Sequence, residues 1–284
     1  MKAIVLGASG LVGNALLEQA PRRLSVVGTT HTQVCSDLVR LDIRDPKAVA
    51  AALADMNVVF MPAAFANVDA CERDPLASRA VNVEGVQNVV RVCRDTAATL
   101  VYYSSDYVFN GKNGPYAEMD TPYPICEYGR QKWEAEQIVA SLEHHLILRT
   151  TWVVGLERLG KNFLYRVVQT LRRGETLLVP NDQFGQPTSA LDLARASWEL
   201  VHNGSRGLFH VAGQTLQSRL EFAHLIADVF GLSDATIRGV SSDQLGQIAL
   251  RPLHGGLISA RVEAILGWQM SSAQTVVQNL YGSL

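Results

Sequence analysis

A tyrosine and a lysine stand four residues apart in a segment with a helical pattern. Tyr128 and Lys132 should therefore project from one face of a helix as neighbours. An ammonium group beside a phenol stabilises the phenolate, so we expect the pKa of Tyr128 to lie below its ordinary value of about 10. Such a tyrosine can protonate a ketone oxygen when hydride reaches the ketone carbon. The spacing alone is common among surface residues, so the interpretation as a reductase depends on what surrounds the pair.

Two serines end a predicted strand upstream of this helix. Ser104 and Ser105 follow residues 100–103 at the carboxyl end of that strand, where doubly wound sheets bind their ligands. We expect Ser105 to hydrogen-bond the substrate carbonyl and to aim it at Tyr128. The structural alternative is a hydroxyl that only caps the strand end.

Three glycines near the amino terminus form a phosphate-binding pattern. They stand in the run Gly7-Ala8-Ser9-Gly10-Leu11-Val12-Gly13, which follows the first predicted strand and opens the first predicted helix. Gly7 permits a tight turn, Gly10 leaves room for a pyrophosphate, and Gly13 lets the helix pack closely on the sheet. A phosphate then lies at the helix amino terminus. The pattern predicts a dinucleotide cofactor; glycines that serve only the turn are the alternative.

The end of the second predicted strand bears on the choice between NAD and NADP. A carboxylate there would bind the ribose 2′-hydroxyl and exclude a 2′-phosphate. Residues 29–32 read Thr-Thr-His-Thr, with neither a carboxylate nor an arginine. We therefore expect NADPH, with NADH also permitted. Asp42, at the end of the third predicted strand, either lies under the adenine or serves as a turn residue before Asp45.

Short β-rich runs alternate with longer helical segments through the first half of the chain. We expect strands at residues 3–6, 25–29, 39–41, 58–61, 100–103 and 146–148, and helices at residues 11–20, 46–54, 76–94 and 126–142. Asp45 should cap the second helix. The alternation predicts an α/β fold, and with the glycine run a Rossmann-type doubly wound parallel sheet.

The second half is less regular. Residues 106–124 hold several glycines and prolines and should form a long functional loop before the Tyr128 helix. Beyond residue 149, helices are expected near 162–172, 192–202, 220–230 and 261–266. We expect residues 1–150 to form an NAD(P)-binding domain that also receives part of 187–212, and residues 151–284 to form mainly a smaller C-terminal substrate-binding lobe.

The composition is that of an ordinary globular enzyme. The 284 residues include 48% hydrophobic and 18% charged residues, and the net charge is -2. Neither a nucleic-acid polymer nor a membrane is expected as a partner, because basic clusters and apolar runs of about 18 residues are missing. The four cysteines form no C-x-x-C unit, which is typical of reduced thiols in a cytoplasmic protein.

No metal site is expected. Adjacent His144 and His145 should point to different sides with no third ligand near, which favours a solvated turn. Asp69 and Glu72 are better explained as acidic residues at a helix start than as a catalytic carboxylate pair.

Several of these segments resemble one known family. Residues 103–109, residues 128–132 with Glu136, and the middle positions Ala63, Ala64, Val68, Asp69, Glu72 and Asn82 are similar to the dTDP-4-dehydrorhamnose reductase family of extended short-chain dehydrogenases. Residues 149–153 and 181–188 resemble that family's substrate-side segments, and 181–188 is the most family-specific run. The resemblance implies NAD(P)H reduction of the 4-keto group of a dTDP-6-deoxyhexulose to give dTDP-L-rhamnose, with Tyr128 as proton donor.

The resemblance also implies roles for single residues. Around the cofactor it places Leu11, Val12, Asp42, Ile43, Ala63, Ala64, Tyr103 and Lys132, beside the glycines already named. Ser105 and Asp106 would touch the sugar of a nucleotide-sugar substrate, and Trp152 would either contact it or belong to the core. Some relatives use metal at a dimer interface, but nothing transfers to a residue here, and a homodimer is left open.

Three departures from the family pattern keep other functions in view. Ser105 stands where the family usually has threonine, residues 154–160 look longer than the family's glycine-rich turn, and glycines in 251–257 replace a polar Asn-Ser. One alternative is a reductase of another nucleotide-linked or secondary-metabolite ketone. Another is a non-catalytic NADP-binding regulatory subunit resembling the methionine adenosyltransferase β subunit.

Overall fold

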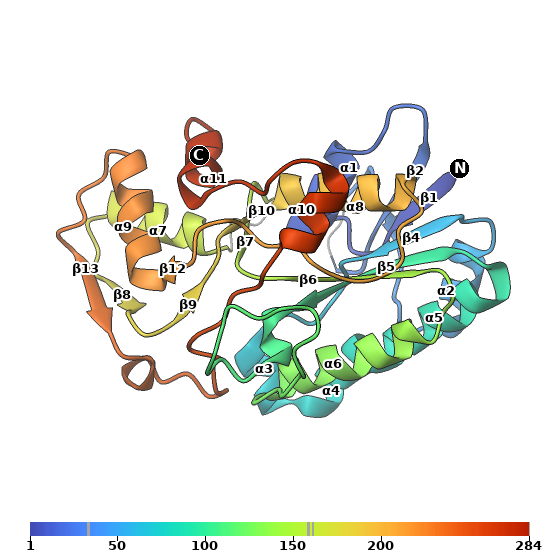
Figure 1. Cartoon of the computed structure of the whole chain (residues 1–284), viewed down its shortest axis with the longest axis horizontal. Helices are drawn as coiled ribbons and strands as arrows, with labels where there is room; N and C mark the ends of the chain where they lie inside the picture. Colours follow the sequence, from blue (N-terminus) through green and yellow to red (C-terminus); the bar gives the residue numbers. More distant parts are fainter. Residues whose placement is uncertain (33–34, 158–159, 161, 284) are drawn as a thin grey trace.

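The centre of the molecule is a seven-stranded sheet with the order β11-β6-β5-β4-β1-β2-β3 (Figure 1). The computed structural model describes residues 1–32, 35–157, 160 and 162–283. The strands are β1 Lys2–Val5, β2 Ser25–Thr30, β3 Val39–Arg40, β4 Val58–Met61, β5 Thr99–Ser105, β6 His145–Thr150 and β11 Gly207–His210. All neighbours pair in parallel. The order reverses between β1 and β4, and such a switch point opens a crevice at the carboxyl ends of the strands.

Helices cover both faces of this sheet (Figure 1). On one face lie α1 Leu11–Glu18, α8 Ala190–His202 and α10 Ala260–Leu266; on the other lie α2 Pro46–Leu53, α5 Gly85–Thr96 and α6 Glu127–Ala140. Alternate strand residues face opposite cores, as the pleat requires. In β1, Ala3 and Val5 pack under α1 and α8, whereas Ile4 and the following Leu6 pack against α5 and α6.

The remaining elements form a smaller lobe with its own apolar core. There β8 Leu177–Pro180 pairs in parallel with β13 Ile237–Val240, beside α7 Phe163–Arg172, α9 Arg219–Val229 and α11 Ala273–Leu280 (Figure 1). Short pairs join β7 Val153–Val154 to β10 Thr188–Ser189 and β9 Phe184–Gly185 to β12 Gln217–Ser218. The 3₁₀ helix η3 Ser242–Leu245 follows β13.

The doubly wound α/β prediction and all the predicted strands are confirmed. Asp45 caps α2 as expected, accepting hydrogen bonds from the backbone N–H groups of Lys47 and Ala48. Residues 106–124 form the predicted loop, apart from the short 3₁₀ helix η2 Asp106–Val108. None of the helices in the described part of the chain is both long and apolar enough to cross a membrane.

The helix expected at residues 76–94 is confirmed in its extent, but it is not a regular α-helix throughout. That stretch is α4 Pro75–Arg79, a π-helical turn η1 Ala80–Glu84, and then α5. Asn82 in the π turn is buried, and its amide bonds the backbone N–H and C=O of Phe65. A π turn widens the helix locally and is frequent at functional sites. The sequence patterns gave no bounds for α3 Val68–Arg73 and did not predict α11 or the edge strand β11.

Residues beyond 150 return to the large sheet. Helix α8 packs on α1, where the indole N–H of Trp198 donates to the carbonyl of Leu16 at 3.0 Å, and β11 pairs with β6. The assignment of residues 1–150 to cofactor and 151–284 to substrate stays a prediction.

Candidate active site

Helix α6 brings the tyrosine and the lysine together as predicted. The ammonium nitrogen of Lys132 lies 5.9 Å from the ring centroid of Tyr128 and 4.7 Å from that of Tyr102. Lys132 is buried and donates a hydrogen bond to the carbonyl of Tyr103 at 2.8 Å, which ties α6 to the end of β5. The first turn of α6 is fixed by the carboxylate of Glu72, which accepts from the backbone N–H of Glu127 at 2.8 Å.

The expected acidic phenol is wrong for this geometry. Burial raises the pKa of Tyr128, and Tyr107, Cys71 and Asp106 add to that rise. Burial also lowers the pKa of Lys132 to about 8. The ammonium makes its close contacts with Tyr103 and Tyr102, so the cost of burying a phenolate exceeds the help it receives. Tyr128 therefore keeps its proton at neutral pH, which is the state that a proton donor needs.

The turn after β5 holds the predicted substrate residues close to one another. The hydroxyl of Ser105 donates to the carboxylate of Asp106 at 3.1 Å and accepts from the backbone N–H of Tyr107 at 3.3 Å. Asp106 is buried and also accepts from the hydroxyl of Thr151 at 2.7 Å. Burial raises the pKa of Asp106 against these hydrogen bonds. Ser105 thus does cap η2, and its proposed bond to a substrate carbonyl stays a prediction.

The glycine run adopts the conformation that its spacing predicts. Gly7 has a φ of +87°, and a Cβ at Gly13 would stand only 2.3 Å from the carbonyl oxygen of Gly7. A Cβ at Gly10 would meet nothing nearer than that same oxygen at 3.4 Å, so it would project into open space. Gly10 begins α1 without a side-chain cap, which leaves backbone N–H groups for an anion. Leu11 and Val12 open the helix.

A cavity of about 340 Å³ lies beside this loop, and we call it the glycine-loop cavity. Its lining includes most of the predicted cofactor residues, namely Gly7, Gly10, Asp42, Ile43, Ala63 and Ala64. The bare glycine backbone at the start of α1 fits the pyrophosphate of a dinucleotide. Tyr103 was also predicted to contact the cofactor, but it does not line this cavity. Its hydroxyl donates to Ser197 at 2.8 Å in the helix layer, and its carbonyl accepts from Lys132.

Sequence reasoning missed other residues of this cavity. Thr29 braces the glycine turn by accepting from the backbone N–H of Gly7, and the hydroxyl of Thr30 donates to that of Ser9. Hydroxyl residues at the carboxyl end of β2 were the available signal. His31 and Arg44 also line the cavity. Arg44 was overlooked because an arginine was sought only at the end of β2.

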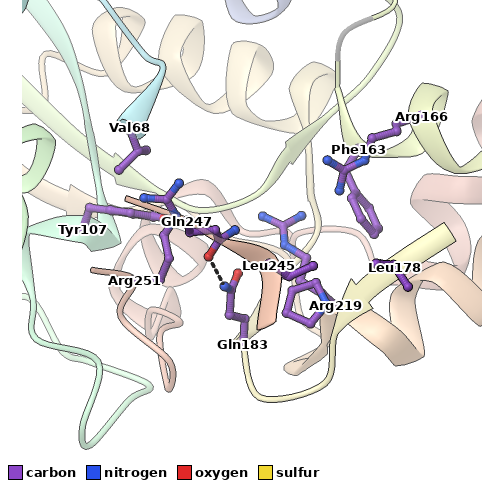
Figure 2. Close-up of a pocket in the computed structure, with 11 residues that line it drawn as sticks. Val68, Tyr107, Phe163, Arg166, Leu178, Gln183, Arg219, Leu245, Gln247 and Arg251 are labelled. Carbon is purple, nitrogen blue, oxygen red and sulfur yellow. Dashed lines mark hydrogen bonds between the residues drawn. The ribbon is translucent and has the colours of Figure 1, made fainter. Parts of the chain in front are cut away.

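A second cavity of about 380 Å³ lies where the smaller lobe meets α3 and η2, and it is rich in cations (Figure 2). It is lined by Val68, Tyr107, Phe163, Arg166, Leu178, Pro180, Gln183, Arg219, Leu245, Gln247 and Arg251. We call it the arginine pocket. Figure 2 shows the guanidinium groups of its three arginines facing the same space.

Two of these arginines have no anionic partner among the described residues. The guanidinium of Arg219 stacks 3.6 Å from the ring centroid of Trp152 and lies 5.0 Å from that of Phe163. The guanidinium of Arg166 lies 5.1 Å from the same Phe163 centroid. Burial lowers the pKa of Arg219 to about 10, so it stays charged at neutral pH. Cations held on aromatic rings without a carboxylate are a binding site for an anionic group.

Trp152 does not line this pocket, but its indole stacks on the pocket residue Arg219. Its φ is +40°, a strained value for a side-chain residue. The indole packs so closely on Gly185 that a Cβ there would stand 2.5 Å from the ring. The predicted contact of Trp152 with substrate stays a prediction.

The altered glycines of residues 251–257 have a packing role. A Cβ at Gly255 would stand 2.8 Å from the Asp106 carboxylate, and Gly256 has a φ of +96°. Arg251, in the same segment, does line the arginine pocket and pairs with Asp69 at 2.9 Å. Residues 158 and 159 of the other departing segment, 154–160, lie outside the described residues.

The acidic residues at the start of α3 act across the fold. Asp69 lies in the first turn, as predicted, and accepts from the backbone N–H groups of Ile248 and Ala249 at 3.1 and 3.0 Å. The solvated turn expected at His144 and His145 is wrong for His145, which begins β6 and whose ring contacts the carbonyl of Leu142. No cluster of metal-ligand residues occurs in the part of the chain that the structure describes.

Tyr128 lines neither cavity, but it contacts a residue of the arginine pocket. Its ring meets that of Tyr107 edge-on at 5.6 Å, and Tyr107 lines the arginine pocket. The segment after β4 passes from Phe65 in the glycine-loop cavity to Val68 in the arginine pocket. This fold, with a Tyr-Lys pair, a dinucleotide cradle and a second pocket, defines an NAD(P)-dependent oxidoreductase of the extended short-chain dehydrogenase class.

Comparison with known proteins narrows the class to a family. The chain belongs to the RmlD substrate-binding domain family, whose model matches residues 1–284. It is 34% identical over 278 residues to the probable low-salt glycan biosynthesis reductase of Haloferax volcanii, covering 94% of this chain and 93% of that protein. It is 33% identical to the dTDP-4-dehydrorhamnose reductase of Mycobacterium tuberculosis, covering 94% and 87%. The structure of the Bacillus anthracis dTDP-4-dehydrorhamnose reductase in complex with NADP has a TM-score of 0.90 at 28% identity, covering 98% and 97%.

Proposed function

We propose that the protein reduces the 4-keto group of a dTDP-6-deoxyhexulose with NADPH, giving dTDP-L-rhamnose. The observation that carries the proposal is that one fold holds the Tyr128–Lys132 pair together with the glycine-loop cavity and with an arginine pocket whose lining residue Tyr107 contacts Tyr128. The names of the relatives from Mycobacterium tuberculosis and Bacillus anthracis support the substrate and the cofactor.

Each residue of the site then has one task. The bound nicotinamide supplies hydride to the ketone carbon. Tyr128 gives its phenolic proton to the ketone oxygen as charge develops there. Lys132 stabilises the phenolate that remains, and Ser105 orients the carbonyl by a hydrogen bond. Asp106, held by Thr151, contacts the sugar hydroxyls.

The arginine pocket binds the diphosphate of the nucleotide. Arg219 and Arg166 supply charge that is not already neutralised, and Arg251 adds a third cation at the rim. Residues 1–150 would then hold the cofactor, and the smaller lobe of residues 151–284 would hold the nucleotide sugar.

The test of the reaction is turnover with a defined substrate. Purified protein is mixed with NADPH deuterated at C4 and dTDP-4-dehydro-L-rhamnose, and the product is examined by NMR for deuterium at sugar C4. The same assay with other nucleotide-linked 4-keto sugars tests the choice of substrate. Folded protein that binds NADPH but reduces none of them would contradict the proposal and favour a regulatory subunit.

The test of the arginine pocket is binding of dTDP, dTMP and thymidine by calorimetry. Arg219→Met should weaken dTDP binding by about tenfold or more and thymidine binding little, because only the diphosphate loses a charge-assisted contact. Arg195→Met is the matched control: Arg195 also stacks on an indole, that of Trp268 at 4.2 Å, but pairs with Glu199 away from both cavities. Equal losses for dTDP and thymidine would contradict a diphosphate contact.

A further inference from the structure

A charged cluster lies in the glycine-loop cavity. Two of its members follow β3, Asp42 and Arg44, and the third, His31, follows β2. The Arg44 guanidinium makes a forked contact with Asp42, with Nε–Oδ1 at 2.9 Å and Nη2–Oδ2 at 2.7 Å. The Nε2 atom of His31 lies 3.3 Å from the same Oδ2 and 3.5 Å from Nη2 of Arg44.

The cluster is open to a ligand. The exposed fractions of the side chains are 46% for His31, 33% for Asp42 and 46% for Arg44. The fork to Asp42 uses Nε and Nη2, so the remaining N–H groups of Arg44 are free to bind a second group. Asp42 and its backbone contact with Arg44 hold the guanidinium at the cavity wall, which reduces the ordering cost of binding.

The charges of the cluster favour binding of an anionic group. Asp42 is the one carboxylate among the residues that line this cavity, and it is already neutralised by Arg44. In contrast, the residues at the end of β2 are Thr30 and His31, so no carboxylate stands at the strand end where NAD-selective folds bind the ribose 2′-hydroxyl. Arginine in a fork geometry is well suited to bind phosphate oxygens.

We propose that Arg44, with His31 beside it, binds the 2′-phosphate of NADPH, and that Asp42 limits the preference for NADPH over NADH. Asp42 holds Arg44 in place but also repels a phosphate, so the cluster accepts both cofactors while favouring the phosphorylated one. The inference rests on the nicotinamide cofactor of the proposed function and adds the residues that choose between its two forms.

The test uses equilibrium binding and needs no turnover. Dissociation constants of NADP⁺, NAD⁺, adenosine 2′,5′-bisphosphate and AMP are measured by calorimetry for the wild type and for Arg44→Met. The substitution should weaken NADP⁺ and the bisphosphate by about tenfold or more and change NAD⁺ and AMP by less than about twofold, since one charge-assisted contact is lost. His31→Gln should show the same pattern with a smaller loss.

Two further variants sharpen the result. Arg40→Met removes an equal charge from the exposed end of β3, outside the cavity lining. This variant should leave the affinity for NADP⁺ relative to that for NAD⁺ unchanged. Asp42→Asn should raise the affinity for NADP⁺ relative to that for NAD⁺, because the repulsion between the carboxylate and the phosphate disappears. An Arg44 variant that weakens NADP⁺ and NAD⁺ equally, or neither, overturns the inference. Wild-type protein that binds neither dinucleotide overturns the proposed function itself, and this outcome is separate from the first.

Discussion

In the proposed reaction the proton comes from the half-buried phenol of Tyr128. Replacing Tyr128 by phenylalanine keeps the ring contact with Tyr107 but removes that proton. We expect the rate of ketone reduction to fall by about 10²- to 10⁴-fold, with the affinity for NADPH unchanged. Single-turnover reduction and fluorescence titration of NADPH would measure the two quantities. A loss of rate below about tenfold would remove Tyr128 from the role of proton donor.

Lys132 gives the reaction a pH dependence. Its pKa is lowered to about 8 by burial, so the ammonium is present below that pH and is lost above it. The value of kcat/KM for reduction should therefore fall as the pH rises through about 8. Lys132→Gln should be slow and should lack this fall. A wild-type profile that stays flat from pH 7 to about 9.5 would contradict the assignment.

The same shift affects stability with a definite sign. The folded pKa of Lys132, about 8, lies below its ordinary value of 10.5, so between these values the unfolded chain binds more protons than the folded one. The lysine thus opposes folding at neutral pH, and this penalty shrinks as the pH rises. The stability gained by Lys132→Met relative to wild type should narrow from pH 7 toward pH 10. Urea unfolding at several pH values measures it.

At the scale of elements, α3 controls the edge of the arginine pocket. Asp69 receives two backbone N–H groups from residues 248 and 249 and pairs with Arg251, whose side chain lines the pocket. Asp69→Ala should raise the KM for the nucleotide sugar by about tenfold while kcat changes much less, because Tyr128 and Lys132 are untouched. A fall in kcat at constant KM would show that α3 acts on the catalytic helix instead.

Local patterns predicted the elements that obey local rules. Gly7, Gly10 and Gly13 signal one strand-turn-helix unit, and the Tyr128 helix keeps a regular period, so both were placed correctly. The π turn at Asn82 was not predictable, because the Asn82 side chain forms its hydrogen bonds with the backbone of Phe65, which is distant in the sequence. The same holds for the arginine pocket, whose lining comes from segments far apart in the sequence. Arg166 and Arg219 resemble ordinary surface arginines until the fold brings them together.

At the scale of the whole molecule, the chain crosses between the two lobes more than once and ties them together. Helix α8 and β11 run back from the smaller lobe into the large sheet, and Gln186 in the connecting run bonds both the N–H and the C=O of Leu257. We therefore expect a single cooperative thermal transition. NADP⁺ and dTDP at 100 times their dissociation constants should each stabilise the fold by about 2.7 kcal/mol. Differential scanning calorimetry that resolves two transitions, with each ligand moving only one, would contradict this coupling.

The close contact of Gly255 with Asp106 restricts how this protein can diverge from or return toward its relatives. Grafting the family's Asn-Ser dipeptide onto positions 255 and 256 would force a side chain against a buried carboxylate and an L-residue into a left-handed backbone. Homologue-guided redesign of the sugar pocket therefore has to adjust the loop backbone and Asp106 in the same step.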